Sequence, residues 1–137
     1  MIYVFDSSFI GALIIPDETN ALVGKMYSKI ENDDLRFTPY LVWHEITNMF
    51  MNLIRRKRFT FESVMEFYPL LEAFHLICDD ATGVEYSKKL LRLCGDYKLS
   101  SYDAAYLELA ERKKATLCTM DERLREAAKK CGVTVIK

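Results

Sequence analysis

Apolar and polar positions along the chain predict a series of strands, each followed by one or more helices. The run Ile2 to Phe5 is continuously apolar and rich in β-branched and aromatic residues, which is typical of a buried parallel strand. Further strand candidates follow at 36–38, 74–78, 115–119 and 133–136. We therefore expect five strands that are covered on both faces by other parts of the chain.

Helical periodicity fills the intervals between these strands. In the interval 40–56, apolar residues recur with the spacing of an amphipathic helix at Val42, Ile46, Met49, Phe50 and Leu53. Other helices are expected at 8–15, 19–31, 60–72, 82–97, 100–113 and 121–130. The alternation predicts an α/β fold with three layers, α/β/α, in which helices cover both faces of a parallel sheet.

Composition narrows the fold class further. The chain has 137 residues, the usual size of one domain, and we expect residues 1–137 to form a single domain. The chain contains only five glycines and three prolines, and these low counts disfavour an all-β fold with many turns. The formal charge of −1 gives no general signal for nucleic-acid binding, so any such contact has to come from local basic patches.

Cysteine usage and the N-terminal sequence indicate a cytoplasmic location. The cysteines lie far apart and form no C-x-x-C pair, so we expect reduced thiols at Cys78, Cys94, Cys118 and Cys131. No basic segment opens the chain, and the longest uncharged stretch, Ser7 to Pro16, is too short to span a bilayer. We expect a soluble, intracellular protein with no membrane partner.

Acidic residues follow two of the predicted strands. Asp6 follows the first strand directly, and Asp121 follows the fourth after Thr119 and Met120. In an open parallel sheet, ligands bind beyond the carboxyl ends of the strands, which makes both positions candidates for a functional site. Either aspartate can also cap the helix that follows it, and the sequence leaves these two interpretations open.

Two further acids lie on predicted helices. Asp103 shares a helical stripe with Tyr106 and Leu107, and that stripe points inward. The small pair Ala104-Ala105 beside it lets the helix approach the sheet closely. Glu45 lies at the edge of the apolar stripe of its helix, and taken alone this position favours a solvated residue over a functional one.

A metal site would explain the four acids together. Carboxylates at one edge of a sheet repel one another unless they are protonated or bind a cation. Oxygen ligands without paired His or Cys select Mg²⁺ or Mn²⁺ over Zn²⁺. The two histidines, His44 on a helix and His75 at the start of the third strand, are expected to have structural roles.

Four segments of the chain resemble the PIN-domain nucleases, and within that family the VapC-type toxins of prokaryotic toxin–antitoxin pairs. These segments are Asp6-Ser7-Ser8, Glu45-Ile46, the stretch from Leu99 to Ala110, and Thr119-Met120-Asp121 continuing to Ile136. The resemblance implies a five-stranded parallel sheet in the order 3-2-1-4-5 that carries a site for Mg²⁺ or Mn²⁺. By motif position, the catalytic and metal-binding acids are Asp6, Glu45, Asp103 and Asp121, with neighbouring hydroxyls at Ser7, Ser100 and Thr119.

The resemblance also implies a function. It indicates a divalent-metal-dependent endoribonuclease that hydrolyses phosphodiester bonds in single-stranded or loop RNA, forms a homodimer and is inhibited by a small antitoxin protein. A PIN-domain nuclease of RNA processing and a catalytically silent binding or dimerisation module remain alternatives. Phosphoryl-aspartate phosphatases are disfavoured, because Ser8 stands where they carry a second Asp, and the absence of a P-loop motif disfavours nucleotide binding.

A negative catalytic pocket needs basic residues around it to hold an RNA backbone. The candidate clusters are 55–58, 88–92 and 112–114. Aromatic residues that could stack on unpaired bases are Tyr40, Trp43 and Tyr68. Solvated helix ends are the favoured explanation of each basic cluster, and core or dimer packing is the favoured explanation of the aromatic residues.

Overall fold

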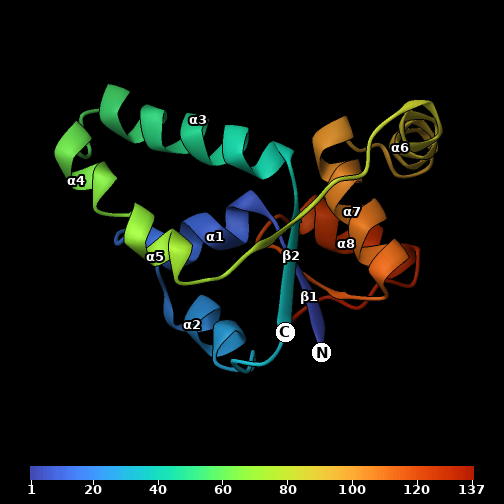
Figure 1. Ribbon diagram of the computed structural model, residues 1–137, viewed down its shortest axis with the longest axis horizontal. Helices are drawn as coiled ribbons and strands as arrows, with labels where there is room; N and C mark the ends of the chain where they lie inside the picture. The colour runs from blue at the N-terminus through green and yellow to red at the C-terminus, as the bar shows by residue number, and fades with distance from the viewer.

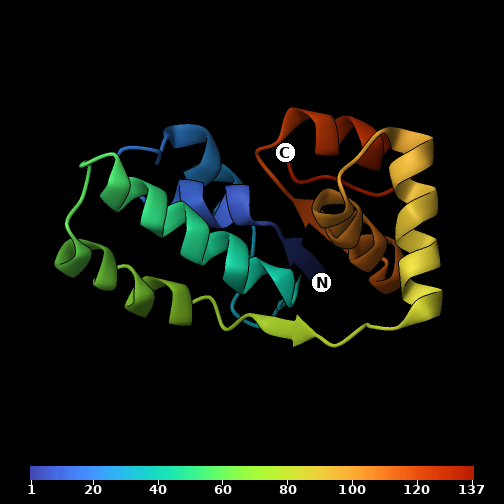
Figure 2. The same cartoon turned by 90° about the horizontal axis from the view of Figure 1, so that it is seen from above.

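The computed structural model describes residues 1–137 and has three layers, with a parallel sheet between two layers of helices (Figures 1 and 2). The strands β1 (Ile2–Phe5), β2 (Leu35–Pro39), β3 (Ile77–Asp79) and β4 (Thr116–Cys118) lie in the order β3-β2-β1-β4. One face carries α1 (Ser7–Ile14), α2 (Ala21–Tyr27), α3 (Leu41–Arg55), α4 (Phe61–Met65) and α5 (Tyr68–Glu72). The other face carries α6 (Val84–Tyr97), α7 (Ser101–Lys113) and α8 (Glu122–Lys130).

The α/β architecture is as predicted, but the sheet has four strands instead of five. At the predicted fifth strand, 133–136, only one parallel bridge forms, between Leu117 and Val135. Leu117 donates to the Thr134 carbonyl at 2.8 Å and accepts from the Ile136 amide at 2.9 Å. Backbone groups of successive strand residues point to opposite sides. β4 is three residues long, so only the backbone of its middle residue, Leu117, faces the segment 133–136. One bridge is therefore all that β4 can form with this segment.

Two predictions for the segment 60–78 are corrected. The predicted helix 60–72 is divided into α4 and α5, and Pro69 lies in the first turn of α5, where its missing N–H breaks no helical hydrogen bond. The third strand begins at Ile77, later than predicted. His75 lies before it in a left-handed conformation with φ of 51°, so it forms part of the turn and does not open the strand.

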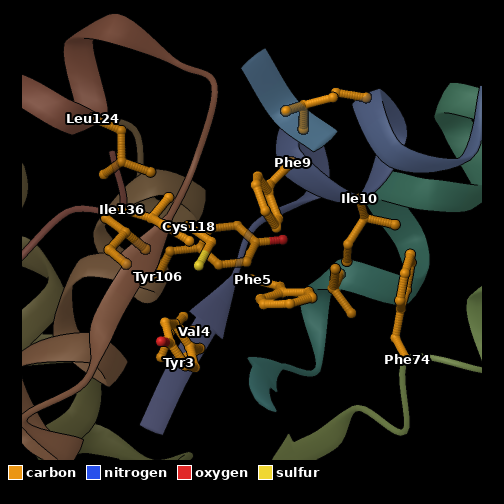
Figure 3. Close-up of a cluster of buried hydrophobic side chains, with 14 of the residues drawn as sticks. Tyr3, Val4, Phe5, Phe9, Ile10, Phe74, Tyr106, Cys118, Leu124 and Ile136 are labelled. Atoms are coloured by element: carbon orange, nitrogen blue, oxygen red, sulfur yellow. The ribbon is translucent and has the colours of Figure 1, made fainter. Parts of the chain in front are cut away.

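A single cluster of 32 buried hydrophobic residues occupies both faces of the sheet. Figure 3 shows Tyr106, Cys118, Leu124 and Ile136 on one side of β1, with Phe9, Ile10 and Phe74 on the other. Phe5, at the end of β1, packs edge-on against Phe9 with 5.0 Å between ring centroids and against Phe74 at 6.0 Å. The packing of Phe5 fixes the carboxyl end of β1, where the candidate site begins.

All four cysteines are free thiols.

Small residues bring the helices close to the sheet and to each other. Ala104 and Ala105 are buried on α7, which packs directly on β1, β2 and β4. Gly11 has the same effect between α1 and α3, because a Cβ at this position would lie 2.6 Å from Sδ of Met49. None of the helices combines the length and the apolar character needed to cross a bilayer.

Candidate functional site

Asp6 lies at the carboxyl end of β1 and is 3% exposed. It caps α1, because its Oδ1 accepts hydrogen bonds from the Phe9 amide at 2.8 Å and from the Ser8 hydroxyl at 2.7 Å. Its Oδ2 accepts a hydrogen bond from the Thr119 hydroxyl, which follows β4. Both carboxylate oxygens are therefore held by groups of this chain.

The hydroxyls of Ser8 and Thr119 join the ends of β1 and β4. Their oxygens lie 3.2 Å apart, and each also accepts a backbone hydrogen bond from the segment after β4. The Met120 amide donates to Ser8 at 2.9 Å, and the Asp121 amide donates to Thr119 at 3.0 Å. Asp121 in turn caps α8 by accepting from the Leu124 amide at 2.9 Å. These bonds fix Asp121 relative to Asp6.

Glu45 reaches the same region from α3. It is half-buried, and its Oε1 accepts a 2.6 Å hydrogen bond from the hydroxyl of Tyr106 on α7. Burial raises the pKa of Glu45, and Tyr106 and the nearby Ser7 hydroxyl oppose this rise. Glu45 therefore lies at the edge of the apolar stripe, as predicted, and the buried phenol of Tyr106 anchors its carboxylate there.

Asp103 lies in the first turn of α7 and is half-buried. Its backbone amide donates to the hydroxyl of Ser100, which caps the helix. No well-formed hydrogen bond holds its carboxylate, although the Ser100 hydroxyl lies close enough to lower its pKa against the larger effect of burial. Asp103 is therefore the acid of this set whose side chain is freest to turn toward a ligand.

Electrostatic coupling links the four carboxylates. Burial, together with a smaller effect of the charge of Asp103, raises the pKa of Asp6 to about 6 against opposing hydrogen bonds from Thr119, Phe9 and Ser8. The pKa of Glu45 is raised by burial first and also by Asp103, and that of Asp103 by burial and then by Asp121. No salt bridge of the structure includes any of the four. Arg123 is the one basic residue whose charge acts on the set, by lowering the pKa of Asp103, and it forms no ion pair with any of the four.

The chemistry of these donors fits a hard divalent cation, since all are carboxylate oxygens. As the side chains stand, however, no group of three or more His, Cys, Asp or Glu residues is arranged to hold one ion. The oxygens of Asp6 are engaged by hydroxyls and an amide, and Glu45 is bound to Tyr106. Ligation by three of them requires side-chain rotation, for which Asp103 has the greatest freedom.

An open cleft of about 620 Å³ adjoins the acids. It lies between α3, the first turn of α7 and the start of α1, and Ser7 and Glu45 belong to both the cleft and the acidic site. The exposed His44 lines it as well. A chain that approached the carboxylates from this side would contact the face of α3.

The structure places the acids as the sequence predicts and also adds residues that the sequence analysis missed. Asp6 and Asp121 lie beyond β1 and β4 and each caps a helix, so the capping interpretation is confirmed, and a metal-binding role for them stays a prediction. Ser8, not Ser7, bonds to Asp6, and Tyr106 is the partner of Glu45. The available signal for Tyr106 was its position one turn after Asp103 on the inward stripe.

Comparison with known proteins supports the fold. Among curated proteins, none is similar enough in sequence to count as a match. The crystal structure of PAE2754 from Pyrobaculum aerophilum superposes with a TM-score of 0.69 at 22% identity, covering 98% of this chain and 83% of that chain. VapBC2 from Rickettsia felis, bound to a DNA fragment from its promoter, gives 0.69 at 12% identity, covering 98% of this chain and 97% of that chain.

A third solved structure is VapC20 from Mycobacterium tuberculosis, described as a sarcin-ricin loop cleaving toxin. It superposes with a TM-score of 0.66 at 15% identity, covering 98% of this chain and 97% of that chain. At such low identities these likenesses show a shared fold. The sequence itself matches the family model of the PIN domain over residues 3–130, and because that match spans nearly the whole chain, the protein belongs to the PIN-domain family.

Proposed function

We propose that this protein is a divalent-metal-dependent endoribonuclease that hydrolyses phosphodiester bonds in single-stranded or loop RNA. The observation that carries the proposal is the coupling of Asp6, Glu45, Asp103 and Asp121, none of which forms a salt bridge in the structure. A cation is the simplest counter-charge for such a set. The PIN-domain family, whose members are typically nucleases, supplies the reaction class.

In this proposal the four acids hold Mg²⁺ or Mn²⁺, with Ser8 and Thr119 orienting Asp6, and Tyr106 orienting Glu45. When bound, the ion supplies Lewis-acid activation for the hydrolysis of a phosphodiester. The carboxylates must be ionised to bind it, and burial raises the pKa of Asp6 to about 6, so this residue ionises only as the pH approaches neutrality.

Basic residues for the RNA backbone are fewer than the sequence suggests. Arg58 pairs with Asp17, and Arg112 pairs with Asp79 and Glu108, so neither is available to a substrate without losing an ion pair. Arg55 and Arg56 make no salt bridge and are exposed at the end of α3. Arg55 lies ten positions after Glu45 on the same helix, about 15 Å along the axis. We assign these two arginines to substrate phosphates.

The solved relatives also support a proposal for partners. One of them is VapBC2 from Rickettsia felis bound to promoter DNA, and another is a toxin named for the RNA loop that it cleaves. We propose by analogy that this chain is the toxin of a toxin–antitoxin pair, acts as a homodimer in the cytoplasm and binds a small antitoxin. A small open reading frame beside its gene, encoding a protein that copurifies with it, is the expected observation.

The decisive test is cleavage of unstructured and loop RNAs by the purified protein with Mg²⁺ or Mn²⁺. Asp103→Asn should lose metal-dependent cleavage, because it removes one charge of the coupled set. Asp33→Asn, at an exposed aspartate outside the site, is the matched control and should cleave as the wild type does. Full cleavage by Asp103→Asn rejects the site assignment. Failure of the wild type to cleave any of these RNAs with either metal rejects the function.

A further inference from the structure

The cleft beside the acids presents side-chain groups that have no partners within the protein. His44, Asn48 and Asn52 line it at intervals of four residues and therefore lie along one face of α3. None of the three side chains makes a hydrogen bond in the structure. Each carboxamide carries an acceptor beside two donors, the pattern that reads the edges of nucleobases.

Apolar surface completes the cleft. Tyr102, in the first turn of α7 and adjacent to Asp103, is 58% exposed and lines the cleft opposite α3. Leu41 and Met49 contribute the remaining hydrophobic lining. Exposed aromatic rings are the surfaces on which unpaired RNA bases stack, whereas amides and imidazoles supply hydrogen bonds to their edges.

The charge of the cleft indicates which part of an RNA strand it fits. No lysine or arginine lines it, and Glu45 does, so a phosphate inside the cleft would meet a negative charge without a counter-charge. Arg55 and Arg56 follow on the same helix just beyond Asn52. A strand whose phosphates lie on these arginines and at the acidic site would place the intervening bases against Asn48 and Asn52. A partner helix would instead require a continuous apolar lining, and only 3 of the 8 lining residues are hydrophobic.

We propose that this cleft is a nucleobase-binding subsite that selects the bases next to the cleaved phosphodiester, with Asn48 and Asn52 reading base edges and Tyr102 stacking on a base. The inference rests on the proposed ribonuclease function, because the substrate strand has to reach the cleft from the acidic site. It assigns sequence preference to α3 and α7, and binding of the backbone to the arginines.

Binding of short RNAs tests the subsite separately from cleavage. In the Asp103→Asn background, affinities for 5′-labelled rA4, rC4, rG4 and rU4 are measured by fluorescence anisotropy in MnCl₂. We expect the tightest and weakest tetramers to differ by about 5- to 100-fold, as specific base contacts give. Asn48→Ala/Asn52→Ala should bring the four affinities to within about 2-fold of one another. Asn32→Ala, at an exposed asparagine in the turn before β2, should leave the spread unchanged.

The aromatic residue is tested with a matched pair of variants. Tyr102→Ala should weaken binding of all four tetramers by about 10-fold, whereas Tyr102→Phe, which keeps the ring, should bind as the parent does. All the positions changed are exposed, so circular dichroism and melting temperature are expected to stay at the parent values. Each asparagine is also changed singly, so that the test stands if the double variant fails to fold.

The outcomes separate this inference from the proposed function. Absent tetramer binding, equal affinities in the parent, or an unchanged spread in the asparagine variants would each overturn the subsite, even if the wild type cleaves RNA. If the asparagine variants keep the differences among the four affinities but no longer copurify with a partner protein, the cleft binds that protein, and the proposed subsite is overturned. If the asparagine variants bind all four tetramers equally but the wild type cleaves no RNA, the base-binding subsite is supported and the nuclease function is rejected.

Discussion

The hydroxyl of Tyr106 donates a 2.6 Å hydrogen bond to Oε1 of Glu45 and so connects α7 with α3 beside the acidic site. Tyr106 is 1% exposed, so water cannot readily replace this partner if the bond is lost. Glu45 lies at the edge of an amphipathic helix, where a carboxylate would otherwise sample several rotamers. The buried phenol therefore restricts Glu45 to one orientation relative to Asp103.

Tyr106→Phe tests this restriction. Burial raises the pKa of Glu45 and the hydrogen bond from Tyr106 lowers it, so removing the hydroxyl should raise that pKa further. Mn²⁺ affinity should fall by about 10- to 100-fold, as for other groups that orient a metal ligand, and metal binding should require a higher pH. Isothermal titration calorimetry between pH 6 and pH 8 measures both effects.

The control for this variant is Tyr3→Phe. Tyr3 is also buried, at 5% exposed, but its hydroxyl contacts only the thioether of Met1 at 3.9 Å. This change should leave Mn²⁺ affinity and its pH dependence as in the wild type. Equal affinities for wild type and Tyr106→Phe would show that the phenol does not position Glu45.

Asp6 should make the metal-free protein less stable as pH rises. Burial raises its pKa from 3.8 to about 6, so between these values the native state keeps a proton that the unfolded chain has released. The native state then binds more protons, and the free energy of unfolding falls with increasing pH, by about 3 kcal/mol at most across this window. Asp6→Asn should flatten that part of the profile.

Urea unfolding in EDTA at several values between pH 4 and pH 7 measures this contribution as the difference between wild type and Asp6→Asn. The difference is needed because other acids shift the other way: hydrogen bonding to the N-terminal amine lowers the pKa of Asp34. Asp33→Asn should give the wild-type profile. Parallel profiles for wild type and Asp6→Asn would contradict the assignment of this slope to Asp6.

Added Mn²⁺ should stabilise the native protein, and this stabilisation should grow as the pH rises. A ligand that binds only the native state stabilises it, by about 2.7 kcal/mol at a free concentration 100 times its dissociation constant. Because the metal competes with protons for the carboxylates, the rise in melting temperature should be larger at pH 7.5 than at pH 5.5. Differential scanning fluorimetry with MnCl₂, against KCl of equal ionic strength, measures it. A shift as large in Asp103→Asn as in the wild type would place the ion away from Asp103.

The sequence predicts the parts of the site that depend on local pattern. Asp6 and Asp121 follow apolar runs, and parallel strands bring such positions to one edge whatever the details of packing. The contact between Tyr106 and Glu45 joins residues 61 positions apart and depends on how α3 and α7 pack, which no local pattern specifies. The missing fifth strand has a similar origin, because pairing at 133–136 is limited by the length of β4 and not by its own residues.

Arg112 holds the end of β3 against α7. Its guanidinium donates to both carboxylate oxygens of Asp79, at 3.1 Å and 2.6 Å, and to Glu108 at 2.7 Å. Burial alone would raise the pKa of Asp79, but the hydrogen bonds from Arg112 outweigh it, so that pKa lies below its ordinary value. α7 also carries Asp103 and Tyr106, so this ion pair supports the helix on which half of the site depends.

Arg112→Ala should therefore destabilise the protein, because it leaves the largely buried carboxylates of Asp79 and Glu108 without a counter-charge. Arg112 is itself partly exposed, so we expect a loss of about 2 kcal/mol, below the cost of breaking a fully buried pair. Arg58→Ala is the control: it also removes an arginine bound to two acids, but its partners Asp17 and Glu18 are well exposed, and its effect should lie within the error of urea unfolding. Equal effects of the two changes would show that the Arg112 contacts add no stability beyond that of a surface ion pair.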